Sequence, residues 1–177
     1  PEHETSHPPQ GRIPVRYLLP NFVTLLSLCS GVTAIRLGIE GRYELAVTAV
    51  IVCIVLDAVD GRLARYLKST SRFGAELDSL ADFVSFGVTP ALLIYLWSLN
   101  DLRTKGWLVC LMLAVCCAMR LARFNVALDD LKKPSWAGRF FTGIPAPAGA
   151  GLAMAPMYLG FLGIIDNGPE SLRPMWP

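Results

Sequence analysis

Five stretches of about twenty mostly apolar residues constrain the fold of this chain more than any other feature. They cover residues 18–37, 43–66, 73–99, 106–126 and 144–165. A bilayer core of about 30 Å is crossed by a helix of about 20 apolar residues. Only 17% of the residues are charged, against about 25% in an ordinary soluble domain. We therefore expect an all-α, polytopic transmembrane helical bundle with five visible spans.

The distribution of basic residues predicts how this bundle is oriented. With the amino end in the cytoplasm, eleven lysines and arginines fall on that side and five on the other. The positive-inside rule then places the loops around residues 67–72 and 127–140 in the cytoplasm. The net charge is only +2, which gives no reason to expect nucleic acid as a partner. The five cysteines lack metal-ligand spacing and are expected to pack in the bundle.

The ends of the chain differ from its apolar centre. Residues 1–12 are polar and without periodicity, so we expect a flexible tail there. Residues 13–165 form the expected transmembrane domain. The chain starts without methionine and stops without a polar tail. We therefore expect a piece of a longer protein, with 166–177 as a truncated C-terminal segment.

Four aspartates stand at helical spacing where the second and third stretches become polar. Asp57 and Asp60 are three residues apart, and Asp78 and Asp82 are four apart, so each pair shares one helix face. A short link reverses the chain between them, so we expect the two helices to pack side by side with converging carboxylates. Acids in a membrane are costly, and these repel one another, so a cation is expected between them. Carboxylate ligands favour Mg²⁺, Mn²⁺ or Ca²⁺ over zinc, and two such ions suit phosphoryl transfer.

Small and basic residues around the aspartates fit a phosphate ligand. Gly61 and Ala64 share the face of the first acid pair and leave room against the backbone, and Gly74 opens the next helix. Arg65 is placed to pair with a phosphate, and the hydroxyls of residues 69–71 offer further donors. The structural alternative is an interfacial charge cluster in which the acids pair with Arg62, Arg65 and Arg72.

The pattern Asp57-x2-Asp60-Gly61-x2-Ala64-Arg65-x8-Gly74-x3-Asp78-x3-Asp82 resembles the complete signature of the CDP-alcohol phosphotransferase family. Its members are membrane enzymes, usually six-helix homodimers, that use divalent metal and displace CMP with the hydroxyl of an acceptor alcohol. The resemblance implies a homodimer, and a sixth helix beyond the end of this sequence. It implies that Asp57, Asp60 and Asp78 hold a pair of Mg²⁺ or Mn²⁺ ions, which Asp82 touches while serving as general base. It also implies nucleotide contacts at Asn21, Thr24, Gly61, Ala64, Arg65, Ser71 and Gly74.

The residues after the third and fourth acids resemble one branch of this family. Ser79 and Phe83 are similar to the phosphatidylserine synthase branch, whereas the glycerophosphate-using branch typically has proline and lysine there. The resemblance implies CDP-diacylglycerol and L-serine as substrates, at a cytoplasm-facing site in the bacterial inner membrane. Glycerol 3-phosphate, inositol phosphate or choline stays open as the acceptor. A divalent-cation carrier is a more distant alternative.

Four further residues are candidates for binding the acceptor. Arg120, Arg123 and Asn125 end the fourth stretch on the cytoplasmic side, where an arginine could bind the serine carboxylate bidentately. Positive-inside anchoring explains the same arginines equally well. Ser85 lies two turns from Asp78 on roughly its face. It could line an acceptor pocket, although helix packing would also account for it.

Overall fold

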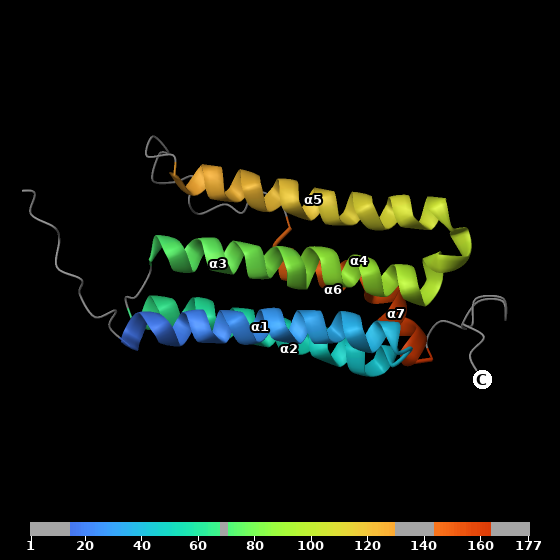
Figure 1. Ribbon diagram of the computed structural model, residues 1–177, viewed down its shortest axis with the longest axis horizontal. Coiled ribbons are helices and arrows are strands. Elements are labelled where there is room, and N and C mark those ends of the chain that lie inside the picture. The colour runs from blue at the N-terminus through green and yellow to red at the C-terminus, as the bar shows by residue number, and fades with distance from the viewer. Residues whose placement is uncertain (1–14, 68–70, 130–143, 164–177) are drawn as a thin grey trace, which may run out of the picture.

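The computed structural model describes residues 15–67, 71–129 and 144–163, and helices make up nearly all of this part of the chain. The helices run roughly along one common axis (Figure 1). No strand occurs in these ranges, so the predicted all-α class is confirmed there. The predicted tail 1–12 and the predicted segment 166–177 lie outside the described residues.

The first two helices form an antiparallel pair. Helix α1 (Val15–Ile39) is followed by a tight turn at Gly41 and then by α2 (Tyr43–Tyr66). Gly41 has a φ of +74°, a conformation that costs glycine little and other residues more. Helix α1 begins before Pro20 and contains it. Because proline has no backbone N–H, α1 lacks one hydrogen bond near its start.

The third predicted span is a continuous run of helical segments from residue 72 to residue 102. The run contains a π-helical segment directly after Asp82, ahead of Pro90. Proline cannot donate to the carbonyl four residues earlier, and a wider π turn accommodates this loss. The segments are α3 (Arg72–Asp82), η1 (Phe83–Val88), α4 (Thr89–Ile94), η2 (Tyr95–Leu99) and η3 (Asn100–Leu102).

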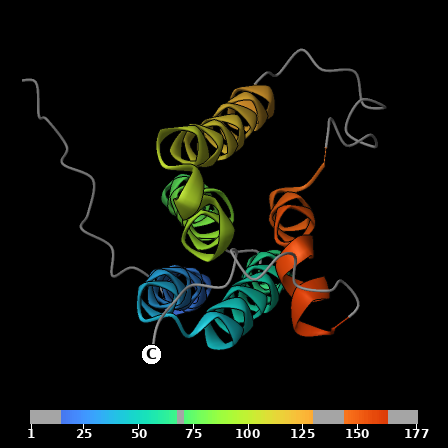
Figure 2. The same cartoon turned by 90° about the vertical axis from the view of Figure 1, so that its right-hand side faces the viewer.

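The chain then reverses at Arg103 into the long helix α5 (Thr104–Asp129). Figure 2 shows α5 packed on the α3–α4 run, away from α1 and α2. In the most apolar stretch of α5, only 11% is buried inside the structure, whereas 44% is buried in the corresponding stretch of the run that ends at Leu102. Helix α5 is therefore the least enclosed long helix among the described residues.

The fifth predicted span, over residues 144–165, is broken in the structure. Helix α6 (Ala146–Ala153) and helix α7 (Ala155–Phe161) are separated at Met154. Pro156 stands in the first turn of α7, where its missing N–H and its ring prevent a continuous helix. The single long helix predicted here is therefore wrong.

Three segments of the described chain are long and apolar enough to cross a membrane: Leu18–Ile39, Arg72–Leu102 and Thr104–Val126. They match the first, third and fourth predicted spans. Helix α2 has the length of a span, but its second half carries the acids and arginines of the motif. The count of five spans therefore stays a prediction.

The main core lies in the half of the bundle away from the aspartates, where α1, α2, α4 and the short α6–α7 pair meet. Ala34, Val50, Leu93 and Met154 are fully buried there. Close approach depends on Gly31, because a Cβ at that position would stand 2.8 Å from Ser85 Oγ. The bundle is therefore tightly closed at mid-length.

Candidate active site

Three aspartate side chains converge at one end of the bundle. Asp57 and Asp60 come from the last turns of α2, and Asp78 comes from α3. Each offers a carboxylate oxygen, and these oxygens lie within 4.8 Å of one another. The carboxyl group of Asp82 adjoins that of Asp57. The predicted convergence of two helical pairs is therefore present in the structure.

The helices that carry these acids pack side by side only in part. Helix α1 packs along α2 and also against α3, and α2 contacts the third predicted span at η1 and α4 rather than at α3. The predicted side-by-side packing is therefore present beyond the acids and weak between α2 and α3 themselves. Facing carboxylates repel at short range, so the acids favour a separation that leaves space between the two helices.

Asp60 is the most buried of the four acids. It is 3% exposed, and its Oδ2 accepts a hydrogen bond of 2.8 Å from the hydroxyl of Thr24 on α1. Its other oxygen, Oδ1, is buried without a hydrogen-bond partner among the described residues. A buried carboxylate oxygen is rarely left unpaired. Together with the two neighbouring carboxylates, it suits a hard divalent cation that takes oxygen ligands.

Arginines do not supply the missing positive charge. Both ion pairs among the described residues are made by Glu40, with Arg36 and Arg42, at the opposite end of α1. Arg65 instead donates from Nε to the carbonyl oxygen of Gly61 at 3.0 Å, on its own helix. The alternative of an arginine-paired charge cluster therefore finds no support in this part of the chain.

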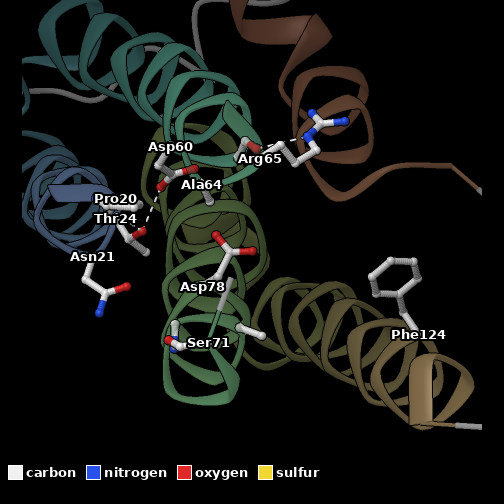
Figure 3. Close-up of a pocket in the computed structure, with 12 residues that line it drawn as sticks. Pro20, Asn21, Thr24, Asp60, Ala64, Arg65, Ser71, Asp78 and Phe124 are labelled. Atoms are coloured by element: carbon white, nitrogen blue, oxygen red, sulfur yellow. Dashed lines mark hydrogen bonds between the residues drawn. The ribbon is translucent and has the colours of Figure 1, made fainter. Parts of the chain in front are cut away.

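A cavity of about 660 Å³ adjoins the aspartates. Its wall combines polar side chains with small residues, and Figure 3 shows Asp60 and Asp78 facing it from α2 and α3. Every residue for which we expect a nucleotide contact lines this one cavity. The complete lining is Pro20, Asn21, Thr24, Asp60, Gly61, Ala64, Arg65, Ser71, Gly74, Ala75, Asp78 and Phe124.

The two glycines of the cavity differ in what surrounds them. A Cβ at Gly61 would meet no atom within 4 Å, so packing in the described chain does not require glycine there. A Cβ at Gly74 would stand 2.9 Å from Asn21 Oδ1 and 3.1 Å from Ser71 Oγ. Ser71 is also the N-cap of α3, since its hydroxyl accepts a hydrogen bond of 3.0 Å from the Gly74 N–H. Gly74 therefore allows Asn21 and the cap to approach α3.

None of the four acceptor candidates is among the residues that line this cavity. Ser85 is fully buried against Gly31, and its Oγ has no hydrogen-bond partner among the described residues. Arg120 donates to the carbonyl oxygen of Ile144, and Arg123 is exposed. Asn125 is hydrogen-bonded to Ser79 on α3.

Sequence reasoning missed three residues of the cavity wall: Pro20, Ala75 and Phe124. Pro20 and Ala75 directly precede or follow residues that we had singled out. Phe124 comes from α5 and lies at the edge of the cavity opposite Asn21 (Figure 3). Its position between Arg123 and Asn125 is the signal that could have identified it.

Comparison with known proteins points to one family. The family model described as CDP-alcohol phosphatidyltransferase matches residues 17–169. A CDP-diacylglycerol–serine O-phosphatidyltransferase of Mycobacterium tuberculosis (strain ATCC 25618 / H37Rv) is 48% identical over 143 residues, which are 80% of this chain and 50% of that protein. The chain thus spans about half the length of this relative.

Two more distant relatives carry related names. A CDP-diacylglycerol–serine O-phosphatidyltransferase of Helicobacter pylori (strain J99) is 38% identical over 138 residues, 78% of this chain and 56% of that protein. An archaetidylserine synthase of Methanothermobacter thermautotrophicus is 36% identical over 146 residues, 80% of this chain and 58% of that protein. The similarity therefore reaches both bacterial and archaeal proteins named for serine or a serine lipid.

Proposed function

The chain belongs to the CDP-alcohol phosphatidyltransferase family and is an integral membrane protein, and from this we propose that it transfers the phosphatidyl group of CDP-diacylglycerol to L-serine. The serine hydroxyl oxygen attacks the phosphorus that carries the diacylglycerol. The bond from that phosphorus to the bridging oxygen of the diphosphate breaks, and CMP leaves. The products are phosphatidylserine and CMP.

One observation carries this proposal: Asp60 and Asp78 of the acid cluster line the same cavity as all of the expected nucleotide contacts. The aspartates come from the second and third predicted spans, whereas Asn21 and Thr24 come from the first. Residues far apart in the sequence thus meet at one end of the bundle. A volume of about 660 Å³ lies within the range of about 300–1,000 Å³ that is typical of small-molecule sites.

The carboxylates of Asp57, Asp60 and Asp78 would hold the divalent metal, which we propose to be two ions of Mg²⁺ or Mn²⁺. Bound there, such ions neutralise charge on the diphosphate and on the departing CMP. Thr24 holds the Asp60 side chain by donating to Oδ2 at 2.8 Å. Oδ1 of Asp60 has no hydrogen-bond partner among the described residues. In this proposal it binds the metal.

Asp82 serves as the general base in this proposal. Its carboxyl group stands next to that of Asp57 and one helical turn from Asp78, so it borders the place where the acceptor hydroxyl must arrive. It takes the proton of the serine hydroxyl as the new oxygen–phosphorus bond forms. Asn21, Gly61, Ala64, Arg65, Ser71 and Gly74 contact the cytidine nucleotide.

Serine is the proposed acceptor because the relatives at 48%, 38% and 36% identity are named for serine or a serine lipid. Arg123 is exposed near the end of α5, and a guanidinium there can bind a carboxylate in two parallel hydrogen bonds. We propose Arg123, Arg120 and Ser85 as residues that serve the acceptor. Asn125, the fourth candidate, donates a hydrogen bond to Ser79 of α3.

We further propose a homodimer in the bacterial inner membrane, with residues 13–165 as its transmembrane catalytic domain and the site facing the cytoplasm. The excess of basic residues around the loops at this end supports that orientation. Cytidine and serine then reach the site from water, while the acyl chains of the donor stay in the bilayer.

The test is a choice of acceptors offered to the full-length protein in lipid vesicles. Labelled CDP-diacylglycerol is supplied with L-serine, glycerol 3-phosphate, inositol phosphate or choline, and the lipid product is identified. We expect phosphatidylserine and CMP with serine, and neither with an Asp82→Asn variant. A different lipid product would contradict serine as the acceptor. Metal flux across the vesicles without CMP release would instead favour a cation carrier.

A further inference from the structure

A polar contact joins the end of α5 to α3 beside the candidate active site. Earlier in the helix, Cys117 packs closely against Gly87 of η1, and Leu121 is only 8% exposed. Beyond Leu121, Phe124 and Val126 are 56% and 72% exposed. This turn of α5 therefore needs another contact to locate it.

That contact is the hydrogen bond between Asn125 and Ser79. Asn125 Nδ2 donates to Ser79 Oγ at 3.0 Å, and both side chains are partly buried. Ser79 Oγ also lies 3.0 Å from the carbonyl oxygen of Ala75, to which it donates its own proton. Ser79 follows Asp78 directly, and Asn125 follows Phe124 directly. The bond therefore links α3, next to Asp78, with α5, next to Phe124, which lines the cavity.

Phe124 gives the cavity an apolar edge that its other large side chains do not provide. Thr24, Asn21 and Arg65 make its polar wall, and Phe124 stands at the edge opposite Asn21 and Thr24 (Figure 3). A CDP-linked lipid has the same division into a polar diphosphate and an apolar glycerol–acyl part. The exposed phenyl ring of Phe124, on a helix apolar enough to cross the membrane, matches the apolar glycerol–acyl part of this lipid.

We propose that Phe124 contacts the apolar part of the lipid donor and that the Asn125–Ser79 hydrogen bond positions it there. This inference rests on the proposed function, because it takes a CDP-linked lipid as the ligand. It makes Phe124 a specificity-determining residue for lipid over free nucleotide. It makes Ser79 and Asn125 positioning residues that act through Phe124.

The test measures equilibrium binding of two probes to the full-length protein in detergent micelles without acceptor: CDP-diacylglycerol and CMP. Phe124→Ala should weaken binding of CDP-diacylglycerol about tenfold, which corresponds to about 1.4 kcal/mol, and leave CMP binding unchanged. Phe124→Leu should keep most of the affinity. Met112→Ala is the matched control, because Met112 is a 68% exposed apolar residue of the same helix outside the cavity.

The positioning step is tested by Ser79→Ala, Asn125→Ala and their combinations with Phe124→Ala. Each single variant should reproduce the loss of lipid affinity, and the combinations should add little further loss, because all act on one contact. Ser79→Thr, which keeps the hydroxyl, should restore binding. Equal losses for CMP and CDP-diacylglycerol, additive losses, or unchanged binding in Phe124→Ala would each overturn the inference.

Failure of this inference can be told apart from failure of the proposed function. If serine is not the acceptor, the acceptor assay yields no phosphatidylserine. Phe124→Ala would still bind CDP-diacylglycerol more weakly than the unsubstituted protein and CMP equally well. If the unsubstituted protein binds CDP-diacylglycerol no more tightly than CMP, the inference is overturned whatever the acceptor. An Asn125→Ala variant that raises only the KM for serine would place Asn125 at the acceptor instead.

Discussion

Replacing Gly61 with alanine separates a role in ligand binding from a role in packing. A Cβ at this position would meet no atom within 4 Å, so the added methyl group displaces nothing in the described chain. Gly61 lies inside α2, and alanine is favoured over glycine in a helix interior by about 0.8–1 kcal/mol. We therefore expect Gly61→Ala to keep or raise the stability of the protein.

The same methyl group should impair the reaction, because Gly61 lines the cavity proposed for the nucleotide. Inserting a methyl group into a filled contact typically costs about 1–3 kcal/mol, which is roughly a 5- to 150-fold loss of affinity. Binding of CMP and of CDP-diacylglycerol should both weaken in that range. The assay combines calorimetric binding, CMP release with serine, and the apparent Tm in detergent.

The matched control is Gly149→Ala in α6. A Cβ at Gly149 also meets no atom within 4 Å, and this residue is not part of the cavity wall. It should keep nucleotide binding and catalysis unchanged. If Gly61→Ala binds CMP as tightly as the unsubstituted protein and turns over within twofold of it, the cavity is not the nucleotide site and the proposal fails.

Three other substitutions test the cluster and its support. Thr24→Val removes the hydrogen bond to Asp60 and should weaken Mn²⁺ binding roughly 10- to 150-fold, since a bond to a charged group contributes about 1.5–3 kcal/mol, while Thr24→Ser should keep the binding. Asp60→Asn should abolish CMP release yet leave the apparent Tm in EDTA equal or higher, because one repelling buried charge is gone; a lower Tm would contradict this. Gly74→Ala should lower activity, because its Cβ would stand 2.9 Å from Asn21 Oδ1 and would displace that side chain from the cavity wall; unchanged activity and CMP binding would argue against a role for Asn21.

The sequence predicted the convergence of the aspartates better than the arrangement of the helices around them. Spacing along a helix is a local property, so the shared faces of Asp57 and Asp60 could be derived from residue numbers alone. The role of Thr24 came only from resemblance, yet its hydroxyl contacts Asp60 across two helices. Phe124 was missed because its contact with the cavity depends on how α5 lies against α3, and its place between Arg123 and Asn125 was the local signal of it.

The errors of prediction have physical causes that a linear pattern does not contain. Membrane helices tolerate proline when neighbours satisfy the freed backbone groups, so Pro156 alone did not reveal the break between α6 and α7. Side-by-side packing of α2 and α3 was inferred from their short connection. A short link limits the distance between helix ends but does not require contact along their lengths.

The shape of the site follows from two opposed tendencies along α1. At mid-length, small residues draw the helices together, as the approach of Gly31 to Ser85 shows. At the end of the bundle, four carboxylates on α2 and α3 favour separation, and α1 contacts both helices there through Thr24 and Asn21. The contact at Gly31 joins α1 to η1, and α1 also packs along α2 and against α3, so α1 holds the two acid-bearing helices. The cavity lies at this end of the bundle and is lined from α1, α2 and α3. Cations bound to these carboxylates would reduce the repulsion between α2 and α3 while the packing of α1 on both helices stays in place.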